Sequence, residues 1–170
     1  GASSDDFTGL TGVTVKFSLK NKDGEVVFCE SVSGVNATPM LEKKLEAVTP
    51  WSAENPYLYD FCVELTGADG VVIETVATKA GFRTFELKNG LMCLNGKRIV
   101  FKGVDRHEFS AERGRAITEE DMLSDIVMMK RNNINAVRTS HYPNQTRWYE
   151  FCDEYGIYVI DETNLETHGT

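Results

Sequence analysis

Acidic, basic and imidazole side chains gather at three places in the second half of the chain, and all three of its histidines lie there. The three groups are Asp105–Glu108, Arg138–Asn144 and Asp161–His168. Carboxylates and imidazoles transfer protons, hold cations and orient polar substrates in enzyme sites, whereas a single histidine is more often structural. Three such groups in one half of the chain predict a polar site rather than unrelated surface residues.

The third group contains a pair that could bind a cation. Glu166 and His168 are two residues apart, so in an extended segment both side chains point the same way. A carboxylate and an imidazole could then share one ion, with a third ligand from elsewhere. The imidazole favours manganese or zinc, because Mg²⁺ prefers oxygen ligands. The alternative is a solvated loop in which both side chains only satisfy hydrogen bonds.

Each polar group follows a predicted strand. Lys97–Val104, Asn135–Ser140 and Ile157–Ile160 are short runs suited to strands, and the last is suited to a strand buried on both faces. Strands that alternate with helices form parallel sheets, and the carboxyl ends of parallel barrel strands converge on the active site. The sequence therefore predicts a strand–helix–strand–helix–strand unit with the polar groups at one edge.

Two helices connect these strands. Thr118 can cap the first, with Asp121 three residues on as a variant capping box, and Asn132-Asn133 ends it. Asn144 can cap the second, and Gly156 can end it. Apolar residues recur at helical spacing inside both segments, as a helix packed on a sheet requires.

The first half of the chain has the period-two alternation of half-buried strands. Val13–Leu19, Glu25–Glu30, Tyr59–Leu65 and Val71–Thr78 alternate or return after turn residues, which is typical of a β-sandwich. Asn-Gly pairs at 89–90 and 95–96 then predict two tight hairpins. The fold class is therefore mixed β and α/β, a sandwich followed by an incomplete parallel unit.

Composition excludes several functions. The net charge is −8, from 26 acidic and 18 basic residues, which leaves no basic excess for a nucleic-acid partner. No run approaches the 18 apolar residues of a membrane span. Cys29, Cys62, Cys93 and Cys152 have no CxxC spacing and sit in apolar or alternating stretches. We expect buried free thiols and a reducing, cytoplasmic compartment.

Three stretches closely resemble the signatures of family 2 glycoside hydrolases. They are Gly103–Glu108, Asn135–Asn144 and Asp161–Gly169. Trp51–Tyr59 and Gly81-Phe82-Arg83 look like the first immunoglobulin-like domain of that family and its exit. The resemblance implies an immunoglobulin-like β-sandwich over residues 1–84 and the N-terminal part of a (β/α)8 TIM barrel over residues 85–170.

The resemblance also implies an activity. β-Glucuronidases share the stretch Arg138–Pro143, but the ending Asn164–Gly169 and Arg106-His107-Glu108 look like the large, metal-dependent β-galactosidases. The implied function is part of a retaining β-galactosidase that hydrolyses terminal β-D-galactosides and that forms a homo-oligomer. The alternatives are a non-catalytic module that binds sugar or a subunit, and a β-glucuronidase relative.

Roles follow from the resemblance residue by residue. His107 and His141 match residues that bind the galactosyl group, and Arg138 matches an arginine that contacts the nucleophile carboxylate. Glu166 and His168 match two ligands of an active-site Mg²⁺, so the family favours magnesium over the ions that spacing alone suggests.

A retaining glycosidase needs two carboxyl groups about 5 Å apart, and in this family both are glutamates on later barrel strands. We therefore expect both to lie beyond Thr170, so that the chain alone contains no catalytic residue. Glu108 and Glu162 match neither role. The chain by itself should hydrolyse no chromogenic β-galactoside.

Overall fold

The computed structural model describes residues 12–33 and 41–165. These residues form two compact units. The first comprises the described parts of Gly1–Val48 and Leu58–Ala80, and the second comprises Thr49–Tyr57 and the described part of Gly81–Thr170. The predicted strand ends at Asp105, Arg138 and Asp161 all belong to the second unit. The domain boundary after residue 84 stays a prediction.

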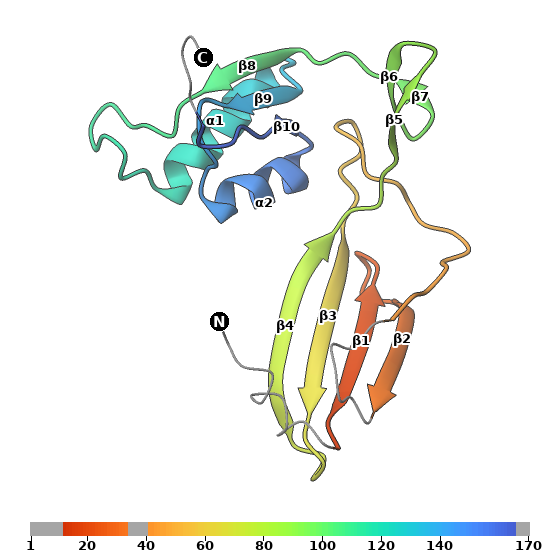
Figure 1. Cartoon of the computed structure of the whole chain (residues 1–170). Coiled ribbons are helices and arrows are strands. Elements are labelled where there is room, and N and C mark those ends of the chain that lie inside the picture. The colour runs from red at the N-terminus through yellow and green to blue at the C-terminus, as the bar shows by residue number, and fades with distance from the viewer. Residues whose placement is uncertain (1–11, 34–40, 166–170) are drawn as a thin grey trace. The chain divides into compact units, whose positions relative to one another are not determined.

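The first unit is an antiparallel sheet of four strands (Figure 1). The strands are β1 (Thr14–Lys20), β2 (Val26–Ser33), β3 (Tyr59–Thr66) and β4 (Val72–Ala80), in the spatial order β2-β1-β3-β4. Turns at Gly24 and Gly70, with φ of 83° and 80°, join the outer strands to the inner ones. The four strands predicted from alternation are thus confirmed.

One face of this sheet is apolar. Val15, Phe17 and Leu19 of β1 stand opposite apolar residues of β3, and Leu19 is 1% exposed, whereas Val76 of β4 is 55% exposed. The sequence predicted a sandwich, but the described residues of this unit form a single sheet. Alternation identifies a face that needs covering; it does not identify what covers it.

Two hairpins open the second unit. They join β5 (Phe85–Lys88), β6 (Leu91–Leu94) and β7 (Lys97–Arg98) into a three-stranded antiparallel sheet. Asn89 and Asn95 have φ of 52° and 51°, and the glycine after each also has positive φ. Asparagine and glycine tolerate this conformation better than other residues, so the predicted turns are confirmed.

The parallel unit follows as β8 (Gly103–Arg106), α1 (Glu119–Arg131), β9 (Ala136–Thr139), α2 (Thr146–Tyr155) and β10 (Tyr158–Ile160). Strand β9 lies between β8 and β10 and is parallel to both. The predicted strand–helix–strand–helix–strand order is confirmed. Its core consists of Ile117, Met122, Ile126, Met129, Val137, Trp148, Phe151, Cys152 and Ile157.

The helix ends agree with the sequence at three of four positions. Thr118 caps α1 and forms a reciprocal capping box with Asp121, and the helix ends at Asn132. Helix α2 ends at Gly156, which has φ of 74°. Asn144 does not cap α2; the helix begins after Gln145, which makes no side-chain cap bond. The prediction failed there because the Asn144 side chain accepts a hydrogen bond from Arg106 instead.

Strand β10 is less buried than predicted. Ile157 is fully buried, but Ile160 is 48% exposed. The apolar run suggested burial on both faces, yet among the described residues β10 pairs only with β9 and forms an edge of the sheet. An edge strand has no neighbour on one side, and its side chains lose that cover.

The segment around Trp51 packs on α2 and β10. The Trp51 indole N–H donates to the Asp153 carbonyl at 2.8 Å, and its ring contacts Tyr158 edge-on at 5.7 Å. Lys130 donates to the carbonyls of Ala53 and Gly156. A Cβ at Gly156 would lie 2.4 Å from the Ala53 carbonyl oxygen, so this close approach requires glycine. The segment precedes β3 in sequence but belongs to the second unit.

The cysteines are all free thiols, but two are not buried. Cys93 and Cys152 are buried, and burial raises the pKa of Cys152 to about 12. Cys29 is exposed and Cys62 is partly exposed, so the prediction was wrong for this pair. Both stand opposite Ser18 on the polar face of the first sheet. Neither helix within residues 12–33 and 41–165 has the length and hydrophobicity to cross a membrane.

Candidate functional site

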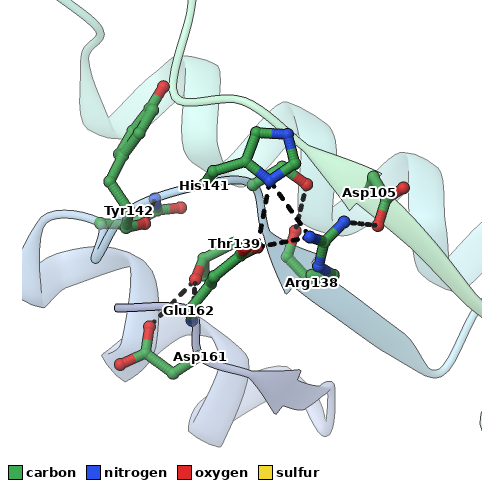
Figure 2. Close-up of polar contacts among 9 residues, drawn as sticks. Asp105, Arg138, Thr139, His141, Tyr142, Asp161 and Glu162 are labelled. Atoms are coloured by element: carbon green, nitrogen blue, oxygen red, sulfur yellow. Dashed lines mark hydrogen bonds and ion pairs between the residues drawn. The ribbon is translucent and has the colours of Figure 1, made fainter. Parts of the chain in front are cut away.

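The ends of β8, β9 and β10 bring charged side chains together, as the parallel order requires. Arg138, on β9, donates from Nη1 to Asp105 of β8 at 3.3 Å and pairs through Nη2 with Glu162, just after β10, at 2.7 Å. Figure 2 shows the guanidinium between the two carboxylates. The predicted meeting of the three polar groups is therefore confirmed for the residues that the structure describes.

His141 joins this cluster through Nδ1. That nitrogen lies 3.1 Å from Glu162 Oε2 and 3.1 Å from Arg138 Nη2 (Figure 2). The hydrogen bond from His141, with those from Arg138, lowers the pKa of Glu162, and the bond to Glu162 raises the pKa of Arg138. A carboxyl whose folded pKa is lowered stabilises the fold above its ordinary pKa. That contribution is lost as pH falls through the lowered pKa.

The second sequence-predicted histidine lies against the first. The ring of His107 meets His141 edge-on at 5.4 Å and lies 6.0 Å from Tyr142. Arg115 stands 5.3 Å from the centre of the Tyr142 ring. His107, His141 and Arg138, proposed from the sequence as substrate-binding residues, therefore lie in one contiguous cluster. Their roles toward a substrate stay predictions.

Glu108 lies beside this cluster and makes two hydrogen bonds that stabilise the local structure. Its backbone N–H donates to the Tyr142 hydroxyl at 3.1 Å, and its carboxylate accepts the N–H of Gln145 at 3.0 Å. An acidic side chain that accepts an orphan N–H at a helix N-terminus is stabilising. The backbone N–H of Gln145, the residue before α2, is thus satisfied by a glutamate distant in sequence, which sequence spacing could not reveal.

A buried network fixes the chain after β10. The Thr139 hydroxyl is fully buried; it donates to Asp161 and accepts from the backbone N–H of Glu162, both at 3.0 Å. The Tyr149 hydroxyl also donates to Asp161, at 2.6 Å. Burial, together with this bond to Asp161, raises the pKa of Tyr149 to about 12, so the hydroxyl stays protonated.

Arg106, at the end of β8, is buried and contacts residues of α1 and α2 and of the segment before α2. Its guanidinium stacks on the Trp148 ring at 3.7 Å, donates to Asp125 at 2.8 Å and donates to Asn144 at 2.9 Å. It is 8% exposed. The stack and the two hydrogen bonds compensate for the burial of its charge, and they join the end of β8 to both helices.

The cation pair predicted at Glu166 and His168 lies outside the described residues. Within residues 12–33 and 41–165, no group of three or more histidine, cysteine or acidic side chains has the geometry of a metal site. A carboxylate oxygen at Glu166 fits Mg²⁺, whereas an imidazole nitrogen is an unusual ligand for that ion.

Sequence reasoning named three of the clustered residues as binding residues and missed the supporting ones. Asp105, Asp161 and Glu162 were recognised only as members of polar groups, and Thr139 and Tyr149 were not singled out. The signal for Glu162 was its place directly after a parallel strand. Thr139 carried no comparable signal, because threonine is common in strands for reasons of packing alone.

The arrangement suits the recognition of a neutral, hydroxyl-rich ligand. Arginine, imidazole and carboxylate groups at one edge offer both donors and acceptors. The pairing of Arg138 with two carboxylates leaves little net positive charge to attract an anionic ligand from solution.

Comparisons with known proteins agree with the resemblance seen in the motifs. Residues 6–83 match the family described as "Glycosyl hydrolases family 2", and residues 85–170 match "Glycosyl hydrolases family 2, TIM barrel domain". The β-galactosidase BgaC of Bifidobacterium adolescentis is 60% identical over 159 residues, which is 93% of this chain and 15% of that protein. A β-galactosidase of Streptococcus thermophilus is 61% identical over 92% of this chain and 15% of its own length.

Solved structures extend the likeness to a second group. A β-glucuronidase from Ruminococcus gnavus in complex with D-glucuronic acid has a TM-score of 0.74 and 30% identity, covering 88% of this chain and 25% of that one. A β-glucuronidase from Parabacteroides merdae has a TM-score of 0.75 at 30% identity, over 88% of this chain and 19% of that one. The chain spans about 15% of the length of the two curated β-galactosidases. With both halves matched, the chain belongs to the family 2 glycosyl hydrolases.

Proposed function

We propose that the longer protein containing this chain is a retaining β-galactosidase that hydrolyses terminal β-D-galactosides. The proposal rests on a difference in sequence identity between two groups of relatives. Identity is 60% and 61% to the two relatives named β-galactosidase, but 30% to the β-glucuronidases of known structure. In this proposal the apolar face of the first sheet belongs to an immunoglobulin-like sandwich, and β8–β10 open the barrel.

The proposed roles of the clustered side chains are those that the family resemblance implies, and the geometry of the cluster is compatible with them. His107 and His141, in edge contact, hold the galactosyl group. Arg138 faces the nucleophile carboxylate supplied by a later barrel strand. Ion pairs with Asp105 and Glu162 restrict the orientation of its guanidinium. Because a planar fork restricted at both ends has few orientations left, it suits the fixing of a carboxylate.

The test of substrate class is a comparison of two chromogenic glycosides on the whole protein. The kcat/KM for 2-nitrophenyl β-D-galactoside should exceed that for 4-nitrophenyl β-D-glucuronide by at least about 100-fold, because a site built for a hydroxymethyl group leaves a substrate carboxylate unpaired. The first product observed by NMR should be β-galactose, as retention requires. Equal rates on the two glycosides, or α-galactose as first product, would contradict the proposal.

A second candidate is a β-glucuronidase relative, which the TM-scores of 0.74 and 0.75 favour. The same comparison decides it, since that enzyme would prefer the glucuronide.

We also propose that Glu166 and His168 bind Mg²⁺ in the whole protein. The support is their i, i+2 spacing after a parallel strand and the likeness of Asn164–Gly169 to the metal-dependent members of the family. A bound cation there would add positive charge beside the catalytic carboxylates and favour their ionised forms.

The metal proposal predicts a defined dependence on free Mg²⁺. Chelator should lower the activity of the whole protein at least about tenfold, and added Mg²⁺ should restore it, since second-sphere and ligand losses at metal sites cost about 10–100-fold. Glu166→Gln should need a higher free Mg²⁺ concentration for half-maximal activity. Glu112→Gln, an exposed glutamate before α1, is the control. If Glu166→Gln depends on Mg²⁺ as the wild type does, Glu166 is not a ligand of the ion.

The remaining parts of the proposal are a cytoplasmic location and a homo-oligomeric whole protein. The free thiols of Cys29, Cys62, Cys93 and Cys152 support a reducing compartment. Light scattering of the whole protein would measure its oligomeric state directly.

A further inference from the structure

One carboxylate oxygen of Asp161, the first residue after β10, accepts hydrogen bonds from two hydroxyl groups. The Thr139 hydroxyl, on β9, donates to Oδ1 at 3.0 Å, and the Tyr149 hydroxyl, on α2, donates to the same atom at 2.6 Å. Thr139 is fully buried, and Figure 2 shows its bond to Asp161. A hydrogen bond to a carboxylate is stronger than one between neutral groups, so this oxygen holds both hydroxyls in place.

Each hydroxyl passes the restraint on to a backbone N–H. Thr139 accepts the N–H of Glu162 at 3.0 Å, and Tyr149 accepts the N–H of Asn144 at 2.8 Å. A backbone N–H can only donate and a carboxylate can only accept. Each hydroxyl proton is therefore directed to Asp161, and each hydroxyl oxygen receives one N–H, so the chemistry of the groups fixes the direction of all four hydrogen bonds.

The two N–H groups belong to the two segments that carry the proposed site residues. Asn144 lies in the loop between β9 and α2, which also contains His141 and Tyr142. Glu162 lies in the segment after β10 and pairs with Arg138 at 2.7 Å. The Asp161 carboxylate thus connects the loop after β9 with the segment after β10 through two side chains that are not in either segment.

We propose that Asp161 is a positioning residue that fixes the loop after β9 and the segment after β10 relative to each other, through the hydroxyls of Thr139 and Tyr149. In this role the carboxylate is a hydrogen-bond acceptor and takes no part in proton transfer to a substrate. The consequence for hydrolysis rests on the proposed function, whereas the restraint itself rests only on the four hydrogen bonds.

The proposal separates two properties of the Asp161 side chain, its charge and its ability to accept hydrogen bonds. Asparagine lacks the charge, but its carbonyl oxygen can still accept two donors, whereas alanine accepts none. Asp161→Asn should therefore keep the restraint and Asp161→Ala should lose it. If the residue acted through its charge, as a proton donor or the ligand of a cation does, the two variants would fail equally.

Hydrogen exchange of the 170-residue chain, followed by ¹H–¹⁵N NMR, measures the restraint without any activity. In Asp161→Ala, the N–H groups of Asn144 and Glu162 should both exchange about tenfold faster after correction for intrinsic rates, because losing a hydrogen bond to a charged group shifts a local opening equilibrium by about this factor. In Asp161→Asn both should stay within about threefold of the wild type. The N–H of Ile157, which donates to the Cys152 carbonyl, is the internal control and should not change.

Two hydroxyl variants test the two connections separately. Thr139→Val should release the Glu162 N–H alone, and Tyr149→Phe should release the Asn144 N–H alone. Tyr155→Phe is the matched control, since Tyr155 is also on α2 and is 37% exposed, and it should release neither.

Unchanged exchange at both N–H groups in Asp161→Ala would overturn the proposal. An equal acceleration at Ile157 would also overturn it, because the loss would then be one of general stability. If Asp161→Ala does not fold, the hydroxyl variants decide: release of one N–H by each supports the proposal, and unchanged exchange in both overturns it.

The whole protein gives the second measurement. Asp161→Ala should lower kcat/KM on a chromogenic β-galactoside by about 10–100-fold, since a displacement of about 1 Å at a reacting centre can cost up to about 100-fold. Asp161→Asn should recover most of this loss, because it keeps the acceptor. Equal losses in the two variants would contradict the positioning role.

The exchange measurement is independent of the substrate assays. Faster exchange in Asp161→Ala of a protein that hydrolyses no β-galactoside would leave the positioning role in place and remove the proposed function. Unchanged exchange in an active β-galactosidase would do the reverse.

Discussion

Replacing Trp148 by alanine should lower the free energy of unfolding of the second unit by about 3–5 kcal/mol, the usual range for removing a buried aromatic side chain. Trp148 is fully buried in the core between α1, α2 and the parallel sheet. Its ring also carries the buried guanidinium of Arg106 at 3.7 Å. The alanine variant would leave a cavity and would remove the surface on which that charge is stacked.

The measurement is urea denaturation of the 170-residue chain followed by far-UV circular dichroism. Because small domains lose about 1–3 kcal/mol of stability per molar urea, the midpoint should fall by more than about 1 M. Met128→Ala is the control, since Met128 is 58% exposed on α1 and surface changes usually stay within about 0.5 kcal/mol. Equal midpoints for Trp148→Ala and Met128→Ala would contradict the core assignment.

Trp148→Phe tests the contributions separately. The indole N–H of Trp148 is buried and has no hydrogen-bond partner among the described residues, so its removal carries no lost bond. Phenylalanine keeps an aromatic face for Arg106. The loss should therefore be well below that of the alanine variant, and a loss as large would show that the stability depends on the part of the indole that phenylalanine lacks.

The order of the parallel unit could be predicted because its local signals agree with one another. Thr118 and Asp121 mark the start of a helix, Gly156 marks the end of another, and short apolar runs lie between. Each signal involves residues close in sequence. The caps act through the backbone hydrogen bonds at the ends of a helix, and they agree with the apolar runs between them. The parallel pairing of β8, β9 and β10 follows once the helices are placed.

The failures all involve partners distant in sequence. Asn144 has the right type to cap α2, but Arg106 is 38 residues away and binds its side chain. Ile160 belongs to an apolar run, yet it is 48% exposed, because among the described residues β10 pairs only with β9. Cys29 and Cys62 lie on the polar face because of the register of β1 with its neighbours. A pattern of residue types contains no information about which distant side chain competes for a hydrogen bond.

The location of the candidate site could be predicted from the sequence, but the contacts between its side chains could not. The position of charged residues after parallel strands placed Asp105, Arg138 and Glu162 at one edge, because strand direction fixes that edge. The single oxygen shared by Arg138 and His141 was not predictable, since it depends on side-chain rotamers. The family resemblance supplied roles for His107, His141 and Arg138, whereas the supporting part of Thr139 and Glu162 came only from the structure.

In the whole protein, Arg138→Met should lower kcat/KM on a chromogenic β-galactoside by about 10²–10³-fold, the usual cost of losing one preorganised electrostatic group at a reacting centre. Arg138 pairs with Asp105 and Glu162 and lies against His141 Nδ1. Methionine has a similar length but neither charge nor donors. The variant would remove the ion pairs to both carboxylates and, with them, part of what lowers the pKa of Glu162.

Arg138→Lys separates charge from geometry. Lysine keeps the positive charge but presents a single point of donation, whereas the guanidinium reaches Asp105 through Nη1 and Glu162 through Nη2. If the planar fork is what the site uses, the lysine variant should retain far less than the wild-type kcat/KM, close to the value for methionine. Recovery of most of the activity by lysine would show that charge alone suffices.

Arg147→Met is the matched control for Arg138→Met. Arg147 also pairs with several carboxylates, those of Glu119, Glu150 and Glu154 on α1 and α2, and these contacts raise its pKa as they do for Arg138. It contacts none of the clustered side chains at the strand ends, so its loss should leave kcat/KM within about twofold of the wild type. Far-UV circular dichroism of all three variants should match the wild type. If a folded Arg138→Met protein keeps more than a third of the wild-type kcat/KM, Arg138 has no role in the active site.

If Arg147→Met lowers kcat/KM as much as Arg138→Met does, the effect comes from the fold of the helices and not from the site.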